Sequence, residues 1–167
     1  GAGLPHRNGS GRDLKESSTL TLPNRRAENR TSVMRPAQCV LIVEDSYLLL
    51  EIIASLCETH GIRVIEASTG EAALTVLRDR GDAIDWLFTD IHLPGLIDGW
   101  TVAHAFRAIH PDRPVVYSST DTNRRSGVPG SLFLRKPFQV QEVNRLVRMM
   151  VEGLGATDRD SQLCTAG

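Results

Sequence analysis

The sequence predicts an α/β protein built as a doubly wound, five-stranded parallel sheet, and three observations support this fold class. Five short apolar runs start at residues 39, 63, 85, 115 and 132. Helical patterns follow most of these runs, as expected when crossover helices join parallel strands. Most of the runs are continuously apolar instead of alternating with polar residues, which is typical of strands covered on both faces.

The first half of the domain is predicted to contain two pairs of strand and helix. Residues 39–43 form the first strand, and apolar residues at helical spacing follow it until Gly61 ends the helix. Residues 63–67 form the second strand. Ser68 and Glu71 have the spacing of a capping box, in which a serine begins a helix and a glutamate three residues later returns the hydrogen bond. We therefore expect Ser68 to cap the second helix.

The second half is predicted to add three strands. Residues 85–89 form the third strand, Asp98 is the expected N-cap of the next helix, and Pro111 stops that helix. Residues 115–118 and 132–135 form the last two strands. Five strands joined in this way favour the flavodoxin-like order 2-1-3-4-5, which places the first and third strands side by side.

The connection between the last two strands differs from the others. Residues 120–130 are interrupted by two glycines and a proline, so the fourth helix should be short or irregular. A final amphipathic helix begins at Val140, and its pattern is lost after Gly153.

The chain is expected to divide into three parts. Residues 1–36 show no helical or strand period and hold seven Lys or Arg against three acidic residues, which predicts a disordered, basic N-terminal arm. Met34 is a candidate native start, in which case part of this arm would not be native. Residues 37–153 form the folded domain, and residues 154–167 form a flexible C-terminal tail.

Composition excludes several classes of function. The net charge is −1, so bulk charge recruits neither nucleic acid nor a membrane. No apolar stretch approaches the roughly 20 residues of a membrane span, and no signal peptide precedes the domain, which predicts a cytoplasmic protein. The three cysteines share no CxxC or Cys/His spacing, which argues against a disulfide framework or a zinc site.

Three carboxylates and one lysine stand at the ends of predicted strands. Glu44 and Asp45 follow the first strand, Asp90 follows the third, and Lys136 follows the fifth. Functional side chains gather at the carboxyl ends of parallel strands, so these four should meet in one crevice. Carboxylates held this close repel each other unless a cation joins them, and hard oxygen ligands suit Mg²⁺. The pattern therefore predicts a magnesium-dependent phosphoryl-transfer site.

Four short motifs, each at the end of a predicted strand, together resemble the receiver domain of two-component response regulators. Each is weak alone, but all four occur in order, at residues 40–45, 89–95 with 98–99, 114–119 and 136–138. The resemblance covers about residues 39–153. It is closest to the single-domain type, since nothing after the domain is long enough for an output domain.

The resemblance implies a role for each acidic residue. Asp90 would accept a phosphoryl group from a histidine of a sensor histidine kinase or a histidine phosphotransfer protein. Asp45 would bind Mg²⁺ directly and Glu44 through water. Asp90 and the backbone carbonyl of His92 would complete the metal ligands.

The resemblance also implies phosphate-binding and switch residues. Lys136 and the hydroxyl of Ser119 would contact phosphoryl oxygens, and a cis peptide is expected between Lys136 and Pro137. Thr120 is larger than the residue often found there in the family, which would restrict access to the phosphate. Phe133 takes the position of the family's aromatic switch and would change rotamer when Ser119 moves inward.

The output implied by the resemblance is a protein contact. The domain would switch a surface for a downstream protein effector, or act as an intermediate or sink in a phosphorelay, without binding nucleic acid directly. It would catalyse only its own phosphorylation and dephosphorylation. Phosphorylation-dependent homodimerisation is left open.

Three alternatives remain at this level. The first is a Mg²⁺-dependent phosphohydrolase of the haloacid-dehalogenase type. Such enzymes place their nucleophile on the first strand in an Asp-x-Asp pair, and here Asp90 is followed by Ile91 and His92, which breaks that pair. The second is a receiver fragment of a longer DNA-binding regulator. The third is a degenerate receiver that works without phosphate, which is disfavoured because every expected site residue is present.

Overall fold

The computed structural model describes residues 36–121 and 126–156, with the side chains of 154–156 excepted. These residues belong to the unit that begins at Arg35. The expected N-terminal arm, apart from its last residue, and most of the expected C-terminal tail lie outside the described residues, so both stay predictions.

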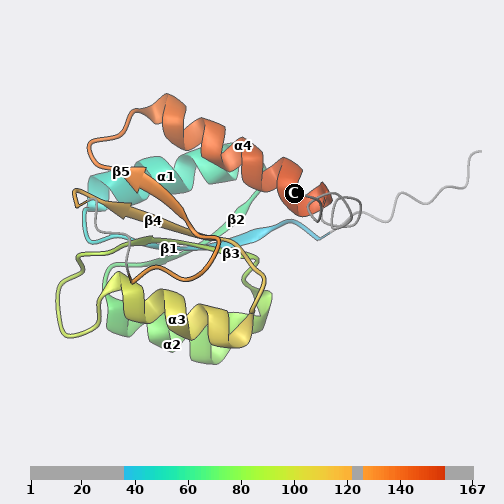
Figure 1. The fold of residues 1–167 in the computed structure, drawn as a ribbon. Coiled ribbons are helices and arrows are strands. Elements are labelled where there is room, and N and C mark those ends of the chain that lie inside the picture. The colour runs from blue at the N-terminus through green and yellow to red at the C-terminus, as the bar shows by residue number, and fades with distance from the viewer. Residues whose placement is uncertain (1–35, 122–125, 157–167) are drawn as a thin grey trace, which may run out of the picture. The chain divides into compact units, whose positions relative to one another are not determined.

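The described residues form a five-stranded sheet in which every pair of neighbours is parallel. The order β2-β1-β3-β4-β5 confirms the predicted fold class (Figure 1). The strands are β1 Cys39–Val43, β2 Arg63–Ala67, β3 Trp86–Asp90, β4 Val115–Ser119 and β5 Leu132–Arg135.

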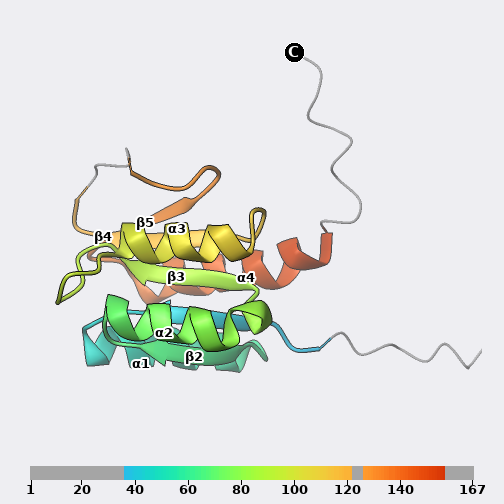
Figure 2. The ribbon, with the colours of Figure 1, turned by 90° about the horizontal axis from the view of Figure 1, so that it is seen from below.

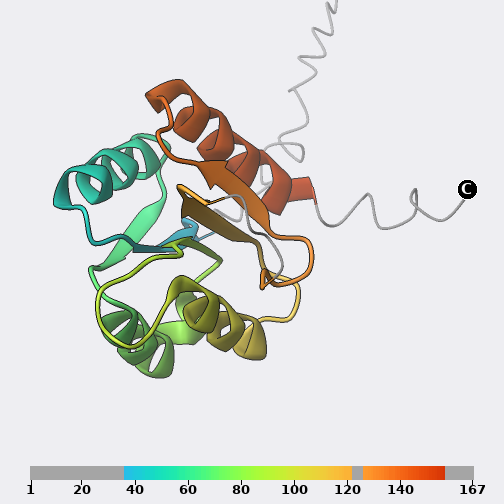
Figure 3. The same ribbon diagram turned by 60° about the vertical axis from the view of Figure 1, so that its left-hand side comes forward.

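Helices cover both faces of this sheet. They are α1 Tyr47–Thr59, α2 Gly70–Arg80, α3 Gly99–Ile109 and α4 Val140–Ala156, and a 3-10 turn, η2 Gly81–Ala83, follows α2. Helices α1 and α4 lie on one face, and α2 and α3 lie on the other (Figures 1 and 3). Seen from below, α2 and α3 run side by side across their face (Figure 2). None of the helices in the described part of the chain is long and apolar enough to span a membrane.

The sheet separates two hydrophobic cores, and β1 contributes to both. Val40 and Ile42 point into the core under α1 and α4, whereas Leu41 and Val43 point into the core under α2 and α3. All five residues of β1 are buried. A strand with both faces covered cannot alternate between apolar and polar residues, and this explains its continuous apolar run.

Several element boundaries differ from those predicted. Strands β3 and β4 each end one residue later than predicted, at Asp90 and Ser119. Strand β3 starts at Trp86 because Asp85 lies level with the start of β1, where its Oδ2 accepts the Cys39 amide at 2.7 Å. Helix α2 is capped by Thr69, whose hydroxyl accepts the Ala72 amide at 3.1 Å, so the predicted capping box at Ser68 is wrong. Helix α4 continues past Gly153 to Ala156.

The segment between β4 and β5 contains no helix in its described residues, 120–121 and 126–131.

An aromatic group covers the neighbouring part of the sheet. The Tyr117 ring lies 4.6 Å from that of Trp100 and 5.1 Å from that of Phe133, between ring centroids. The Tyr117 hydroxyl also accepts the backbone amide of Val128 at 3.1 Å. This bond ties the described part of the connection to the sheet.

Candidate metal centre at the carboxyl edge of the sheet

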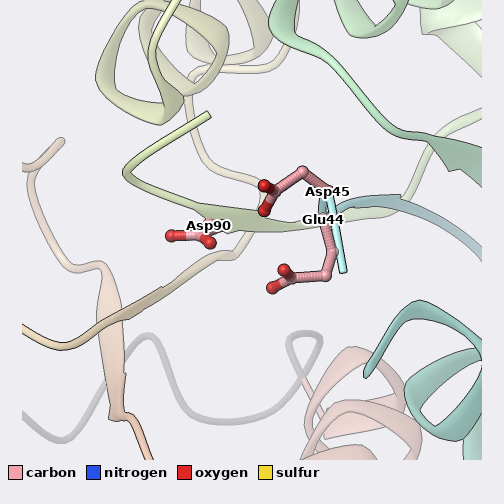
Figure 4. A group of neighbouring side chains, drawn as sticks. All are labelled: Glu44, Asp45 and Asp90. Carbon is pink, nitrogen blue, oxygen red and sulfur yellow. The ribbon is translucent and has the colours of Figure 1, made fainter. Parts of the chain in front are cut away.

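Parallel pairing of β1 with β3 brings three carboxylates together. Val43 pairs with Thr89, so the next residues, Glu44 and Asp90, leave the two strands at the same level. One carboxylate oxygen from each of Glu44, Asp45 and Asp90 lies within 4.8 Å of the other two. Figure 4 shows these side chains gathered at the ends of the two strands. Glu44 and Asp90 are buried and Asp45 is exposed, so the cluster opens to solvent on the Asp45 side.

Lys136 completes the cluster from the end of β5. Its Nζ donates to Glu44 Oε2 at 2.8 Å and to Asp90 Oδ2 at 2.6 Å. Its backbone amide donates to the Ser119 carbonyl oxygen at 2.9 Å, which fixes the lysine against the end of β4. The peptide bond from Lys136 to Pro137 is cis, as the resemblance implied. One ammonium group therefore bridges two carboxylates that belong to different strands.

Burial and the hydrogen bonds of the bridge have opposite effects on the pKa values of Glu44 and Lys136. Burial raises the pKa of the Glu44 carboxyl above its ordinary 4.5, and the hydrogen bonds from Lys136 and from the Ser46 amide oppose the rise. Burial by itself would lower the pKa of Lys136, but its hydrogen bonds to Asp90 and Glu44 raise that pKa above 10.5. Lys136 therefore stays charged at neutral pH, and its hydrogen bond and charge favour the ionised form of the buried Glu44 against the effect of burial.

Replacing the ammonium group should cost stability in a pH-dependent way. We expect Lys136→Met to lower the free energy of unfolding by about 2 kcal/mol at roughly pH 8, because the buried Glu44 carboxylate loses its partner. A carboxyl with a raised pKa binds more protons in the folded state, so the loss should shrink as the pH falls towards 4.5. Urea unfolding of both proteins in EDTA across this pH range measures the difference in their free energies of unfolding.

Arg135→Met provides the matched control for this substitution. Arg135 is the last residue of β5, next to Lys136, and its side chain is exposed. Its removal should change the free energy of unfolding by less than about 0.5 kcal/mol at either pH. A loss in Lys136→Met that stays equal across the pH range would contradict the role given to Glu44.

The other predicted site residues are not all at this cluster. Ser119 is buried at the end of β4, and its hydroxyl accepts the Asp121 amide at 3.0 Å. The next residue, Thr120, is exposed. The His92 amide donates to Asp90 Oδ1 at 3.0 Å, which orients the carboxylate. Phe133 packs in the aromatic group on the α3 side of the sheet instead of at the cluster.

Glu71 is a polar residue near this edge whose contact the sequence did not reveal. Its spacing from Ser68 predicted a local cap, but its Oε1 accepts the amide of Leu96, 25 residues away, at 2.9 Å. Leu96 lies in the loop between β3 and α3. Such a contact has no short-range signature, because it depends on how α2 packs beside that loop.

The residues present suit a hard divalent cation. Three carboxylates converge, and the described side chains at the cluster include no sulfur ligand. Mg²⁺ in proteins binds oxygen donors, usually one or two carboxylates directly, and keeps several waters through which a further carboxylate can be held. The exposed Asp45 side leaves room for those waters. The donor set therefore fits the predicted metal.

The chain is similar to known proteins over most of this domain. The family model for the response regulator receiver domain matches residues 40–148. Two-component response regulator ARR14 of Arabidopsis thaliana is 27% identical over 117 residues, which cover 67% of this chain and 30% of that protein. The probable transcriptional regulatory protein TcrX of Mycobacterium tuberculosis is 28% identical over 127 residues, which cover 73% of this chain and 53% of that protein.

A solved structure agrees with these relatives. The response regulator receiver protein from Sinorhizobium medicae is 33% identical, with a TM-score of 0.64, over 70% of this chain and 96% of that one. The curated relatives are longer, so this chain corresponds to one part of each of them. The match over more than half of the chain shows that it belongs to the response regulator receiver domain family.

Proposed function

We propose that Asp90 is the phosphoacceptor of this receiver domain and takes its phosphoryl group from a histidine of a sensor histidine kinase or a histidine phosphotransfer protein. The observation that carries the proposal is the convergence of Glu44, Asp45, Asp90 and Lys136 at one edge of the sheet. An Asp90 oxygen attacks the phosphorus, and the new P–O bond forms as the P–N bond to the histidine breaks.

Glu44, Asp45, Asp90 and the backbone carbonyl of His92 would hold Mg²⁺. The ion, when bound, neutralises the carboxylates and the charge on the phosphoryl oxygens. The chain's own residues position the nucleophile. The His92 amide holds one oxygen of Asp90, and Lys136 holds the other.

Lys136 and Ser119 also respond to the new phosphoryl group. The Lys136 ammonium group, which now bridges Glu44 and Asp90, would pair with a phosphoryl oxygen. The Ser119 hydroxyl accepts a hydrogen bond in the present structure, and its own proton can be donated to a second oxygen. Thr120, exposed beside Ser119, would restrict access to the phosphate.

The inward movement of Ser119 would be passed on to Phe133. Phe133 packs against Tyr117, two residues before Ser119 on β4, so a shift of β4 reaches the aromatic group directly. The altered surface of β4 and β5 would then bind a downstream protein effector, or the domain would serve as an intermediate or sink in a phosphorelay. The chemistry is self-phosphorylation and dephosphorylation, with no other substrate.

Intact mass tests the proposal directly. Incubation of the chain with acetyl phosphate and Mg²⁺ should add one phosphoryl group per molecule, and EDTA should prevent the addition. The product should be labile to base, as acyl phosphates are. Failure to gain mass would contradict the proposal, and steady hydrolysis of small phosphomonoesters would favour a phosphohydrolase instead.

One observation supports a second form of the same function. The chain spans 53% of TcrX, whose name describes it as a transcriptional regulatory protein. A receiver domain that belongs to a longer DNA-binding regulator would pass its signal to an attached output domain. The reading frame downstream of the coding sequence distinguishes this form from a single-domain protein.

A further inference from the structure

We propose that Glu71, on α2, is a positioning residue of the metal centre, because its carboxylate fixes the loop that carries His92. The inference rests on the proposed function, in which the His92 carbonyl is a metal ligand. The loop in question, residues 91–98, joins β3 to α3. Nothing in the sequence around Asp90 points to a residue that lies 19 positions earlier in the chain.

The carboxylate contacts the loop through backbone amides. Glu71 Oε1 accepts the Leu96 amide at 2.9 Å. Hydrogen bonds from the backbone amides of Leu96, of Glu71 itself and of Ile97 lower the pKa of Glu71, so the acceptor is ionised at neutral pH. Because the partners are main-chain groups, this contact restrains the path of the loop and does not depend on which side chains the loop carries.

Two glycines make room for this contact. Gly95 adopts a φ of 92°, and a Cβ there would lie 2.7 Å from Glu71 Oε1 and 2.9 Å from Oε2. A Cβ on Gly70 would collide with the backbone oxygen of Ile97. The first turn of α2 therefore lies close to the loop at Gly70 and at Gly95. A side chain at either glycine would push the helix and the loop apart.

The loop has other anchors. Near its start, the Ile91 amide donates to the Ser118 carbonyl oxygen at 3.1 Å, and the His92 amide donates to Asp90 Oδ1 at 3.0 Å. At its base, the Gly99 amide donates to the Ile91 carbonyl oxygen at 2.9 Å. Leu93 and Ile97 are half-buried against the core. Between them Leu96 is 96% exposed, so burial of apolar surface does not hold the middle of the loop. Glu71 contacts the loop in this middle part.

The consequence concerns metal affinity. His92 lies immediately before the half-buried Leu93, near the start of the loop. Glu71 holds the same loop four residues further on, at Leu96. Groups that orient metal ligands without touching the metal typically change metal affinity by about 10- to 100-fold when they are removed. The His92 amide stays bonded to Asp90 Oδ1, so the loss of Glu71 would widen the range of orientations of the His92 carbonyl without freeing the residue, and only some of these orientations would suit the metal.

Calorimetric titration of the full chain with Mg²⁺ tests the inference with three variants. Glu71→Ala should raise the Kd for Mg²⁺ about tenfold. Glu71→Gln keeps an acceptor oxygen for the Leu96 amide and should stay within about twofold of the unmodified chain. Glu142→Ala is the matched control, because Glu142 is also exposed and accepts a backbone amide, that of Gln139 at 2.6 Å, but does so at the start of α4.

Hydrogen exchange in EDTA gives a second readout, which needs neither metal nor phosphoryl donor. The amides of Leu96 and Ile97 should exchange faster in Glu71→Ala and keep their rates in Glu142→Ala. An unchanged Kd and unchanged exchange in Glu71→Ala would overturn the inference. So would equal weakening of Mg²⁺ binding by Glu71→Gln, because the charge and not the hydrogen bond would then be responsible.

These outcomes separate the inference from the proposed function. If the unmodified chain takes up neither Mg²⁺ nor a phosphoryl group, the proposed function itself fails, and the inference fails with it. If the unmodified chain binds Mg²⁺ and is phosphorylated while Glu71→Ala behaves identically, only the role of Glu71 is refuted.

Discussion

Asp90→Asn should abolish phosphoryl uptake from acetyl phosphate while leaving the fold in place. Asp90 is the last residue of β3 and is 5% exposed, so its orientation is fixed by its surroundings. Asparagine has nearly the same shape, and its single oxygen can still accept the hydrogen bond from Lys136 or from the His92 amide. The amide group, however, lacks the carboxylate oxygen that attacks phosphorus, so we expect no gain in intact mass.

A carboxylate in the loop that follows Asp90 provides the control for this experiment. Asp98 caps α3, and its Oδ1 accepts the Thr101 amide at 2.9 Å. Asparagine is an equally good N-cap, so Asp98→Asn should fold normally and take up one phosphoryl group. Phosphoryl uptake that persists in Asp90→Asn would refute the assignment of the phosphoacceptor and would require a search for another nucleophile.

Gly99→Ala should destabilise the domain more than other single-methyl additions to its helices. Gly99 is the first residue of α3, and a Cβ there would collide with the Asp90 carbonyl oxygen and lie 2.8 Å from both Asp90 C and Ile91 Cα. These are backbone atoms at the end of a buried strand, so they cannot move aside without disturbing the sheet. We expect a loss of about 3 kcal/mol and a fall in melting temperature of about 10 °C.

Gly153→Ala is the matched substitution, and it should raise stability where Gly99→Ala lowers it. Gly153 also lies in a helix, α4, but a Cβ there would meet no atom within 4 Å. Alanine favours the helical backbone over glycine by about 0.5–1 kcal/mol, so this variant should be slightly more stable than the unmodified chain. Thermal unfolding of both variants measures the contrast, and equal melting temperatures would show that α3 can shift away from β3 at little cost.

The strands of this protein were predictable because their signal is local. A strand covered on both faces needs consecutive apolar residues, and β1 reads as such a run directly in the sequence. The parallel order then follows from the crossover connections, which restrict the topologies available. The start of β3 was predicted one residue early, because the pairing of Asp85 with Cys39 involves a partner 46 residues away.

The gathering of the acidic residues at one edge of the sheet was also predictable, for a related reason. Strand order 2-1-3-4-5 places the ends of β1 and β3 side by side, so acidic residues at those ends must meet wherever they lie in the chain. The sequence thus determined which carboxylates and which lysine would gather. It did not determine their contacts, such as the bridging of Glu44 and Asp90 by one ammonium group.

The sequence by itself determined the fold class and the residues at the carboxyl edge of the sheet, because both depend on periodicity within short segments. Only the tertiary structure decided that Thr69 and not Ser68 caps α2, and that Glu71 reaches the loop before α3. A carboxylate within reach of two sets of backbone amides bonds to the set that packing brings closer. The choice depends on how segments distant in the chain pack together, and a local sequence pattern carries no information about that packing.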